Sequence, residues 1–478
     1  MEENLKSKTK VGLYWSFFNQ FAGYGMNFVI GIVMARLLSP SDYGITALPA
    51  VFTLVAQQLQ DGGLSGALVR KPDMTEKDLS TAFYYSIVVG IFLYLALFLA
   101  APWIADFYNT PVLVPLMRLT ALGFLWGPLA TPQTVILKRR LDFKTPTKIA
   151  IINRVMGAAI GIGLALMGYG LWALVISNVF GGIFYVLFNW LAVRWLPKTG
   201  WSKESFKYLW NYGNKMMASG LLDTLYNNIA PVFIGKYYSP AQLGVYNRAQ
   251  GYAALPSSNI TGVIANVSFP VLSKLHDDDE ALASNYRRML KVSAFVIFPL
   301  MMGLSALARP LVITMITAKW EGCIILLQII CFNMMWYPIH AINLNLLQVK
   351  GRSDLFLRLE IIKKVIGLCI LCFSLPLGLI VFCSCGIVSC LICLFINTYY
   401  TGKLINVGFF KQMKDLLPIS FLSFAMWGLV HVCTYFLSNM WAQLIVGTLV
   451  GAAFYLGVAY LFKFDEIKDV KYLLNRKK

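Results

Sequence analysis

Four basic side chains lie inside stretches of the chain that are otherwise apolar: Arg154, Lys215, Arg248 and Lys364. A charged group at membrane depth is costly, and it usually faces a partner or a water-filled cavity. A guanidinium group also presents a planar fork of donors that matches phosphate oxygens. Because these bases outnumber the acids in the same stretches, the sequence predicts an anionic ligand. The alternative for Arg154, Lys215 and Lys364 is that their side chains extend to the cytoplasmic headgroups, whereas Arg248 lies closer to the outer face.

Polar side chains without a positive charge gather in the first two apolar stretches of each half. They are Asn19, Asn27, Gln57, Asp61, Asp223, Asn227, Asn247 and Gln250. Amide side chains both donate and accept hydrogen bonds, which suits sugar hydroxyls. The two aspartates have a second interpretation as ion-pair partners of the basic residues. By symmetry the four stretches should face one another across a central cavity, and we expect these residues to line a wet path there.

The sequence offers little of the chemistry that an enzyme needs. It contains no G-x-x-x-x-G-K phosphate loop, and His276, His340 and His431 are isolated from one another. Six of the nine cysteines lie between Cys369 and Cys393, and no histidine accompanies them in the sequence. We interpret these cysteines as small apolar residues of helices. We therefore expect a protein that is not an enzyme and that needs neither a metal ion nor a cofactor.

The apolar stretches are long enough to cross a membrane. Apolar residues make up 58% of the chain and charged residues 13%, whereas a soluble domain carries about 25% charged residues. A helix needs about 20 apolar residues to cross the hydrocarbon core, and on this basis we predict about fourteen spans. They are 11–37, 43–68, 80–104, 112–137, 147–167, 170–195, 207–235, 241–272, 286–316, 322–348, 356–378, 380–402, 414–437 and 440–462. The predicted fold is an all-α polytopic membrane protein.

The chain resembles itself at two offsets. At an offset of 200 residues, the motif S-P-x-x-x-G at 39–44 recurs at 239–244. At an offset of 210 residues, the motif W-x-P at 126–128 recurs at 336–338. Internal repeats that frame a site at their interface are typical of membrane transporters.

The repeat predicts how the chain is divided. We expect two pseudo-symmetric six-helix lobes, at 1–200 and 201–403, around a central cavity. Two further transmembrane helices and a basic cytoplasmic tail should follow at 404–478. In this scheme Lys364 is the counterpart of Arg154, so each lobe carries a base at the same position.

The basic residues predict the direction in which the chain is threaded. The formal net charge is +19, from 41 Lys and Arg against 22 Asp and Glu. If the N-terminus lies in the cytoplasm, most Lys and Arg fall into alternate loops on the cytoplasmic side, as the positive-inside rule requires. The charge therefore reflects membrane topology, and we expect no binding of nucleic acid. The first apolar block should remain as a span, because it lacks a small-residue cleavage site.

Several motifs resemble those of a known transporter branch. They are A-R-L-L-S-P-S-D-Y-G at 35–44, L-Q-D-G-G-L-S-G-A-L-V-R at 59–70, L-K-R-R-L-D-F-K at 137–144, G-Y-G-L-W-A-L-V at 168–175 and L-G-V-Y-N-R-A at 243–249. Nearly the whole chain resembles the polysaccharide-transporter branch of the multidrug/oligosaccharidyl-lipid/polysaccharide exporter superfamily. The likeness is strongest to lipopolysaccharide-biosynthesis flippases of the colanic-acid-exporter type.

The resemblance implies a flippase that moves an oligosaccharide linked to a lipid diphosphate, of the undecaprenyl-diphosphate type, across the bacterial inner membrane. It implies fourteen helices and a cationic lumen, which Arg248 could supply. The bilayer and other polysaccharide-assembly proteins are the partners to expect, with both termini in the cytoplasm. Two alternatives stay open: a cation-coupled multidrug exporter of the same superfamily, which needs an acidic site, and a membrane glycosyltransferase or ligase, which needs a catalytic loop.

The threading is testable by labelling single cysteines in a cysteine-free variant. A cysteine at position 142 should react with an impermeant maleimide only after the membrane is permeabilised, because the segment 138–148 carries dense basic charge. A cysteine at position 110, between the third and fourth predicted spans, should react in intact cells and serves as the control. Labelling at 142 in intact cells would mean that the topology is inverted.

Overall fold

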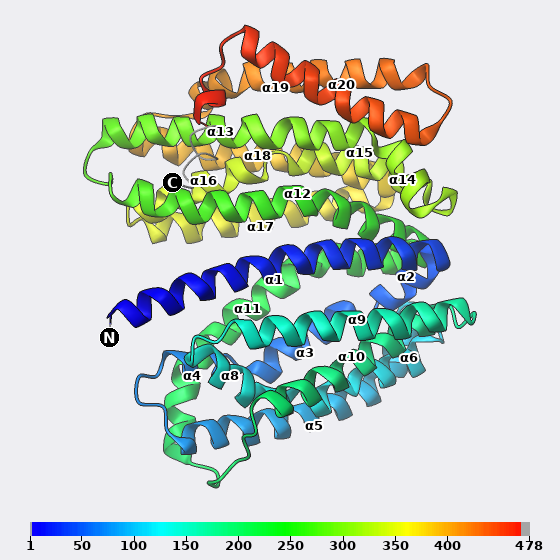
Figure 1. The fold of residues 1–478 in the computed structure, drawn as a ribbon, viewed down its shortest axis with the longest axis vertical. Coiled ribbons are helices and arrows are strands. Elements are labelled where there is room, and N and C mark those ends of the chain that lie inside the picture. Colours follow the sequence, from blue (N-terminus) through cyan, green and yellow to red (C-terminus); the bar gives the residue numbers. More distant parts are fainter. Residues whose placement is uncertain (1, 470–478) are drawn as a thin grey trace. The chain divides into compact units, whose positions relative to one another are not determined.

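The computed structural model describes residues 2–469, and this part of the chain is helical and contains no strand (Figure 1). It divides into two compact units with the boundary between Gly244 and Val245, called the N-terminal unit and the C-terminal unit below. The boundary separates the parts of the chain that pack most densely within themselves, and it places the helix at 203–237 in the N-terminal unit. The lobes at 1–200 and 201–403 rest on the sequence repeat instead, and they stay predictions.

The N-terminal unit contains long helices that are interrupted at short breaks. Its elements are α1 (Glu2–Leu37), α2 (Pro40–Ala47), α3 (Ala50–Asp61), α4 (Leu64–Arg70), α5 (Glu76–Phe107), α6 (Leu113–Ala121), α7 (Gly123–Trp126), the 3-10 turn η1 (Gly127–Ala130), α8 (Thr131–Arg139), α9 (Lys144–Leu166), α10 (Leu171–Ala192) and α11 (Lys203–Tyr237).

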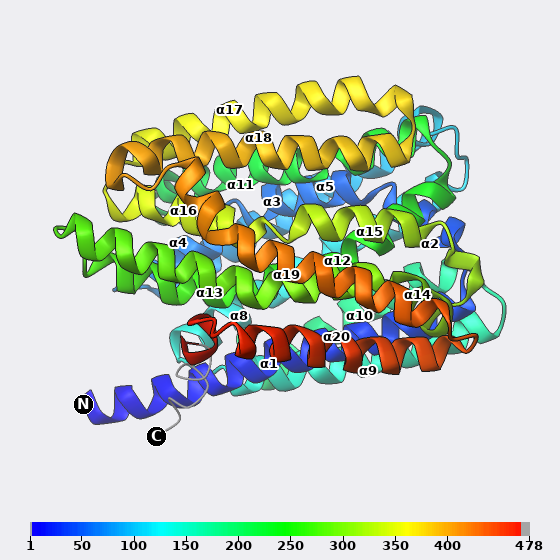
Figure 2. The same cartoon turned by 90° about the horizontal axis from the view of Figure 1, so that it is seen from above.

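Helix α12 (Pro240–Ser273) begins in the N-terminal unit and continues into the C-terminal unit. The elements after it are α13 (Asp279–Ala306), α14 (Ala308–Ile316), η2 (Ala318–Trp320), α15 (Cys323–Met334), α16 (Tyr337–Val349), α17 (Ser353–Ser374), η3 (Leu375–Leu377), α18 (Leu379–Ile405), α19 (Phe409–Tyr435) and α20 (Met440–Leu461). Within this unit α17 lies beside α18 (Figure 2), and α19 and α20 form a hairpin (Figure 1).

Every predicted span is helical in the structure. Not every one of these helices is long and apolar enough to cross a membrane. In the part of the chain that the structure describes, nine helices or helix runs are long and apolar enough to cross a membrane. A tenth span is possible if the bent pair Phe18–Leu37 and Pro40–Arg70, which turns by 119°, crosses as one. Helices α11 and α12 fall short because they carry many of the polar candidates. The number of fourteen crossings therefore stays a prediction.

Each copy of the repeated Ser-Pro motif begins a helix in the same way. At the start of α2, the Asp42 amide donates to Ser39 Oγ (3.2 Å) and the Ser39 amide donates to Asp42 Oδ2 (2.9 Å). At the start of α12, the Gln242 amide donates to Ser239 Oγ (3.3 Å) and the Ser239 amide donates to Gln242 Oε1 (3.2 Å). Both are capping boxes followed by proline at the first helical position, so the repeated residues recur as a repeated local structure.

The glycines of the two motifs allow a reciprocal backbone contact. A Cβ atom on Gly44 would overlap the carbonyl group of Pro240, and a Cβ atom on Gly244 would overlap the carbonyl oxygen of Pro40. Each motif thus needs its glycine because the proline backbone of the other motif lies against it. Such reciprocity is the geometry expected of a pair related by a two-fold axis.

A second close approach joins α11 to the break between α3 and α4. Gly62 and Gly63 make this break with left-handed backbone angles, φ 54° and 69°. A Cβ atom on Gly63 would overlap the Gly213 carbonyl, and one on Gly213 would overlap the Gly62 carbonyl. Membrane helices gain little from the hydrophobic effect when they associate, because the lipid around them is also apolar. They associate through close contacts at small residues such as these glycines instead.

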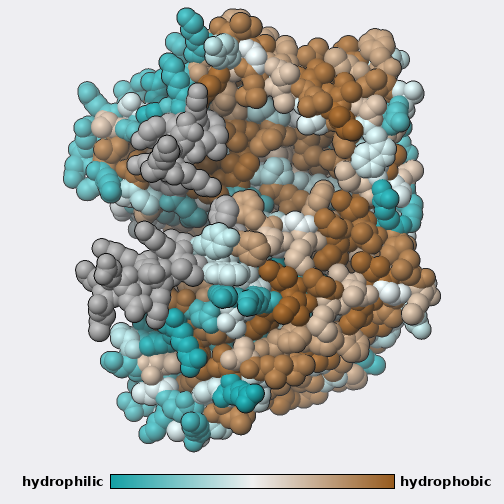
Figure 3. Space-filling model, in the orientation of Figure 1, coloured by the Kyte–Doolittle hydropathy of each residue, from teal (hydrophilic) through white to brown (hydrophobic). Residues whose placement is uncertain are grey.

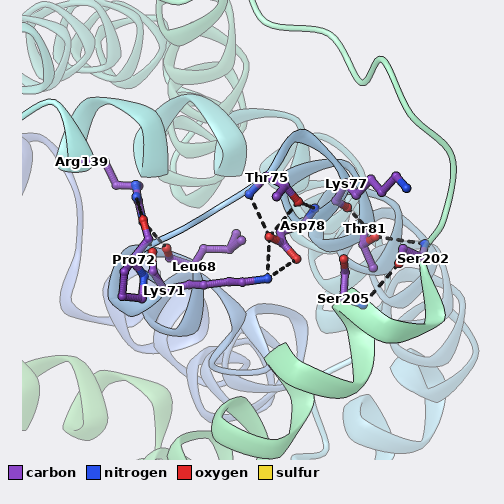
Figure 4. A network of polar contacts seen from close by, with 10 residues as sticks. All are labelled: Leu68, Lys71, Pro72, Thr75, Lys77, Asp78, Thr81, Arg139, Ser202 and Ser205. Atoms are coloured by element: carbon purple, nitrogen blue, oxygen red, sulfur yellow. Dashed lines mark hydrogen bonds and ion pairs between the residues drawn. The ribbon is translucent and has the colours of Figure 1, made fainter.

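A buried carboxylate organises one end of the N-terminal unit (Figure 4). Asp78, in the first turn of α5, is fully buried and binds Lys71 Nζ at 2.8 and 2.9 Å. It also accepts hydrogen bonds from the Thr75 amide and hydroxyl, both at 2.9 Å. A buried charge is tolerated only when it is paired and hydrogen-bonded in this way. We call the group formed by Lys71, Thr75, Asp78, Thr81, Arg139 and Ser202 the Asp78 network.

The Asp78 network ties four helices together, α4, α5, α8 and α11. Arg139, at the end of α8, donates to the carbonyl oxygens of Leu68 (3.0 Å) and Pro72 (2.8 Å) around the α4–α5 loop (Figure 4). The Ser202 amide, at the start of α11, donates to Thr81 Oγ1 of α5 (3.1 Å). The loop that carries the chain into α11 is therefore fixed to α5.

The C-terminal unit has its own buried polar cluster. Tyr286 of α13 donates to Asn343 Oδ1 of α16 (2.8 Å), and Gln412 Nε2 of α19 donates to Asn343 Oδ1 (3.2 Å) and Thr401 Oγ1 (3.0 Å). All four side chains are buried and hydrogen-bonded. A fully satisfied network of this kind fixes the register of the helices that contribute to it.

Ion pairs close the same end of the C-terminal unit. Arg287 Nε of α13 donates to Asp415 Oδ2 of α19 (2.6 Å), and Arg288 Nε donates to Asp469 Oδ2 (2.8 Å) after α20. The hydrogen bond from Arg288 holds the pKa of Asp469 below its ordinary value.

In the face that Figure 3 shows, hydrophobic residues cover the helix flanks, and hydrophilic residues gather near the loop between α12 and α13.

Removing the charge of Asp78 should destabilise the N-terminal unit. Asp78→Asn leaves Lys71, whose side chain is only 21% exposed, without a counter-charge, and this should cost about 2–3 kcal/mol. The measurement is the fraction of detergent-purified protein that stays monodisperse after heating. Asp73→Asn, in the exposed part of the same loop, is the matched control and should behave as wild type. Equal losses for both variants would contradict this role of Asp78.

Candidate functional site

A polar pocket opens inside the N-terminal unit between α1, α9 and α10. Its volume is about 530 Å³. The polar side chains that line it are Asn27, Tyr43, Asn153, Arg154, Ser177, Asn178 and Tyr185. Among the described residues that line it, none is acidic. Two of the predicted site residues, Arg154 and Asn27, thus come together here from helices far apart in the sequence.

Small residues create the space of this pocket. Gly31 of α1, Gly157 and Gly161 of α9, and Gly181 and Gly182 of α10 all line it. Three neighbouring helices therefore present little side-chain volume toward the same point. The pocket lies within the range of 300–1,000 Å³ that is common for small-molecule sites.

The Arg154 guanidinium lies beside Gly23 of α1. A Cβ atom on Gly23 would lie 2.8 Å from Arg154 Nη1 and 3.0 Å from Cζ, so the glycine makes room for the guanidinium. Arg154 Nη1 is buried and has no hydrogen-bond partner among the described residues. The same holds for Asn153 Oδ1. The pocket thus contains a positive charge and a polar acceptor atom, each with hydrogen-bonding capacity that the described residues leave unused.

Arg248 has different surroundings in the C-terminal unit. Its Cζ atom lies 5.1 Å from the ring centroid of Trp320 and 5.8 Å from that of Tyr252. Trp320 is fully buried, in the turn η2 after α14. A cation over an aromatic face is attracted by the ring quadrupole, and the attraction grows where water is excluded. Sequence reasoning missed Trp320, because it lies 72 positions from Arg248 and carries no signal of its own.

Gln250 lines a smaller pocket of the C-terminal unit. This pocket, of about 170 Å³, lies between α12, α15, α17 and α18, and Tyr246, Asn333 and Ser389 also line it. Gln250 Nε2 lies 4.0 Å from Met334 Sδ. The sequence-predicted candidates therefore fall in at least two separate places, one in each unit.

The other predicted site residues are spread over their helices. Lys215, Gln57, Asp61, Asp223 and Asn227 are exposed, whereas Asn19, Asn247 and Lys364 are half-buried. Asp61 accepts a hydrogen bond from Ser65 Oγ (2.5 Å), one turn away. Asn19 Oδ1 is buried without a hydrogen-bond partner among the described residues. Their role in binding stays a prediction.

A histidine lies beside one of the cysteines in space, although none accompanies them in the sequence. His340 Nε2 of α16 lies 3.2 Å from Cys390 Sγ of α18, and His340 Nδ1 lies 3.0 Å from Asn397 Nδ2. The sequence did not reveal this pair, because 50 positions separate the two residues and only helix packing joins them. All nine cysteines are free thiols. Within residues 2–469, no group of three His, Cys, Asp or Glu side chains could hold a metal ion.

Comparison with known proteins gives the family. The family described as "Polysaccharide biosynthesis protein" matches residues 33–325. The chain belongs to this family. It is 29% identical to the teichuronic acid biosynthesis protein TuaB of Bacillus subtilis (strain 168), over 63% of each chain. It is 24% identical to the lipopolysaccharide biosynthesis protein WzxC of Escherichia coli (strain K12), over 75% of this chain and 74% of that one.

Solved structures establish the fold of this family member. A lipid II flippase, MurJ, in an inward closed conformation matches with a TM-score of 0.76 at 17% identity, covering 96% of this chain and 99% of that one. An inward-facing multidrug transporter of the MATE family matches with a TM-score of 0.61 at 17% identity, covering 79% and 94%. The chain is thus an all-α polytopic membrane protein with the fold of these transporters.

The environment of Cys390 predicts which cysteine matters for stability. Cys390→Ala removes the thiol from beside the imidazole of His340 and should cost about 1–2 kcal/mol. Cys369→Ala, at an exposed position of α17, should cost nothing measurable. The thermal unfolding midpoint of the two purified variants gives the comparison. A shift that is as large for Cys369→Ala would refute the importance of the pair.

Proposed function

We propose that this chain is a flippase that moves an oligosaccharide linked to a lipid diphosphate from the inner to the outer leaflet of the bacterial cytoplasmic membrane. It would do so by alternating access, as a step in the assembly of a surface polysaccharide. The observation that carries the proposal is the membership in the polysaccharide biosynthesis family, together with a fold shared with a lipid II flippase over 96% of the chain.

The chemistry of the helices supports such a cargo. A diphosphate cannot cross hydrocarbon unaided, because burying an ionised group without partners costs many kcal/mol. The N-terminal pocket supplies a guanidinium and several amides, with no acid among its described lining residues. The amides suit sugar hydroxyls and the guanidinium suits a phosphate. The lipid tail can stay in the bilayer, so only the head group needs a polar path.

The proposal includes a place and a direction in the cell. A multi-pass membrane protein with most Lys and Arg in alternate loops fits the inner membrane with both termini in the cytoplasm. The substrate carrier would be of the undecaprenyl-diphosphate type, and other polysaccharide-assembly proteins are candidate partners. No enzymatic step is part of this proposal.

A multidrug exporter is the second candidate, because a MATE transporter has a similar fold. An exporter of organic cations needs an acidic binding site, and the candidate residues include four bases against Asp61 and Asp223. Transport into vesicles separates the two functions. Uptake of a labelled lipid-linked sugar, without uptake of a labelled organic cation, is the result expected of the flippase.

Arg248 provides the residue-level test of the proposed function. If Arg248 attracts the diphosphate, Arg248→Glu should reduce surface polysaccharide at least tenfold, because a charge-assisted hydrogen bond contributes about 1.5–3 kcal/mol. Arg248→Lys keeps the charge but loses the planar fork, so it should retain partial export, and Arg248→Ala should fall between the two. The measurement is surface polysaccharide in a strain that depends on this protein, with the protein level recorded alongside.

An exposed arginine of the same unit gives the matched control. Arg309 is 60% exposed and pairs with Glu321, so Arg309→Glu should leave export unchanged. Full export by Arg248→Glu at normal abundance would remove Arg248 from the binding site. Low abundance of all three Arg248 variants would instead assign it a structural role through Trp320 and Tyr252.

A further inference from the structure

The pocket between α1, α9 and α10 has the composition of an oxyanion site that is complete within the N-terminal unit. We infer that Arg154 binds a phosphate group there, and that Asn27, Asn153 and Asn178 hold hydroxyls of the sugar joined to that phosphate. The preference for an anion rests on the pocket alone. The identification of the ligand as a sugar phosphate rests on the proposed function.

The depth of Arg154 in its helix argues against a lipid headgroup as its partner. Arg154 lies ten residues after the start of α9 at Lys144 and twelve before its end at Leu166. At a rise of 1.5 Å per residue, the start of the helix is about 15 Å away, which is half the thickness of the hydrocarbon core. An arginine near the middle of a span needs a partner inside the protein or a ligand that comes to it.

The unsatisfied atoms of the pocket specify the ligand. Arg154 Nη1 donates and Asn153 Oδ1 accepts, and both are buried without a hydrogen-bond partner among the described residues. Leaving a charged donor unsatisfied costs more than leaving a neutral one, so the site favours an anion next to the guanidinium. The acceptor beside it needs a donor, such as a hydroxyl group. A phosphate with a hydroxyl-rich neighbour satisfies both.

Gly23 leaves room for the guanidinium, and this allows a test that keeps the charge. A methyl group on Gly23 would come within 2.8–3.0 Å of the guanidinium and must displace it. Gly25, two residues further along α1, has nothing within 4 Å of a Cβ atom. Gly23→Ala and Gly25→Ala are therefore a matched pair with the same change in helix propensity, and only the first disturbs Arg154.

The experiment measures binding to the full-length protein in nanodiscs of phosphatidylcholine. The probes are glucose 1-phosphate, inorganic phosphate and glucose, and isothermal calorimetry gives the Kd. We expect glucose 1-phosphate to bind more tightly than phosphate, and glucose not to bind. Arg154→Gln should weaken glucose 1-phosphate at least tenfold, Gly23→Ala severalfold, and Gly25→Ala less than twofold. Unchanged affinity in Arg154→Gln, or no binding by wild type, would overturn the inference.

Further arms separate the sources of the anion and the two proposals. If adding phosphatidylglycerol to the nanodiscs abolishes glucose 1-phosphate binding, the pocket takes a bilayer headgroup and the inference is wrong. If Arg154→Gln loses binding but exports polysaccharide normally, the site is not on the transport path, and the sugar-phosphate assignment fails. If binding depends on Arg154 but wild type moves no lipid-linked sugar, the flippase proposal fails while the anion site stands. Should Arg154→Gln not fold, Gly23→Ala against Gly25→Ala decides the question.

Discussion

Close backbone contact at glycines is the constraint on which the architecture of the N-terminal unit depends. In a bilayer, lipid tails are as apolar as leucine, so helices gain little by burying apolar side chains against one another. Contact must come from close approach instead. Gly63 and Gly213 let α11 touch the α3–α4 break, and Gly44 and Gly244 each admit the backbone of the opposite Ser-Pro motif. These contacts bring together segments about 150 to 200 residues apart, and they position α11 and the start of α12 within the N-terminal unit.

Small residues also leave space for a pocket between helices. Glycines of α11 and of the α3–α4 break allow close packing. Glycines on α1, α9 and α10 leave an open pocket. Where the helices touch, the backbone fills the space, and where they diverge, the space is free for a ligand. The polar side chains then determine its chemistry. The inferred anion with hydroxyl groups fits Arg154 and the asparagines, whereas an acidic residue in the same position would fit a cation.

Arg154 and Arg248 show that one residue type can serve two purposes. Arg154 lies against a glycine backbone with a donor left unused, in a pocket of neutral polar groups. Arg248 lies over the rings of Trp320 and Tyr252, which stabilise its charge from within the C-terminal unit. The surroundings of the first are polar side chains and a helix backbone, and those of the second are aromatic faces. The sequence presents both as basic residues inside apolar stretches and ranks Arg248 first, but it does not reveal how their surroundings differ.

The sequence by itself determined the properties that depend on composition and period. The length of the apolar stretches defines helices that cross a membrane, and the excess of bases within them predicts an anionic ligand. The repeated Ser-Pro motif predicts helix starts that recur as matching caps. Tertiary structure alone decided which polar residues share a pocket. Arg154 shares a pocket with Asn27, and Cys390 lies beside His340, because helix packing fixes the rotation of each helix against its neighbours. That rotation depends on contacts between distant segments, at Gly23 or Gly213 for example, and no local pattern in the sequence records it.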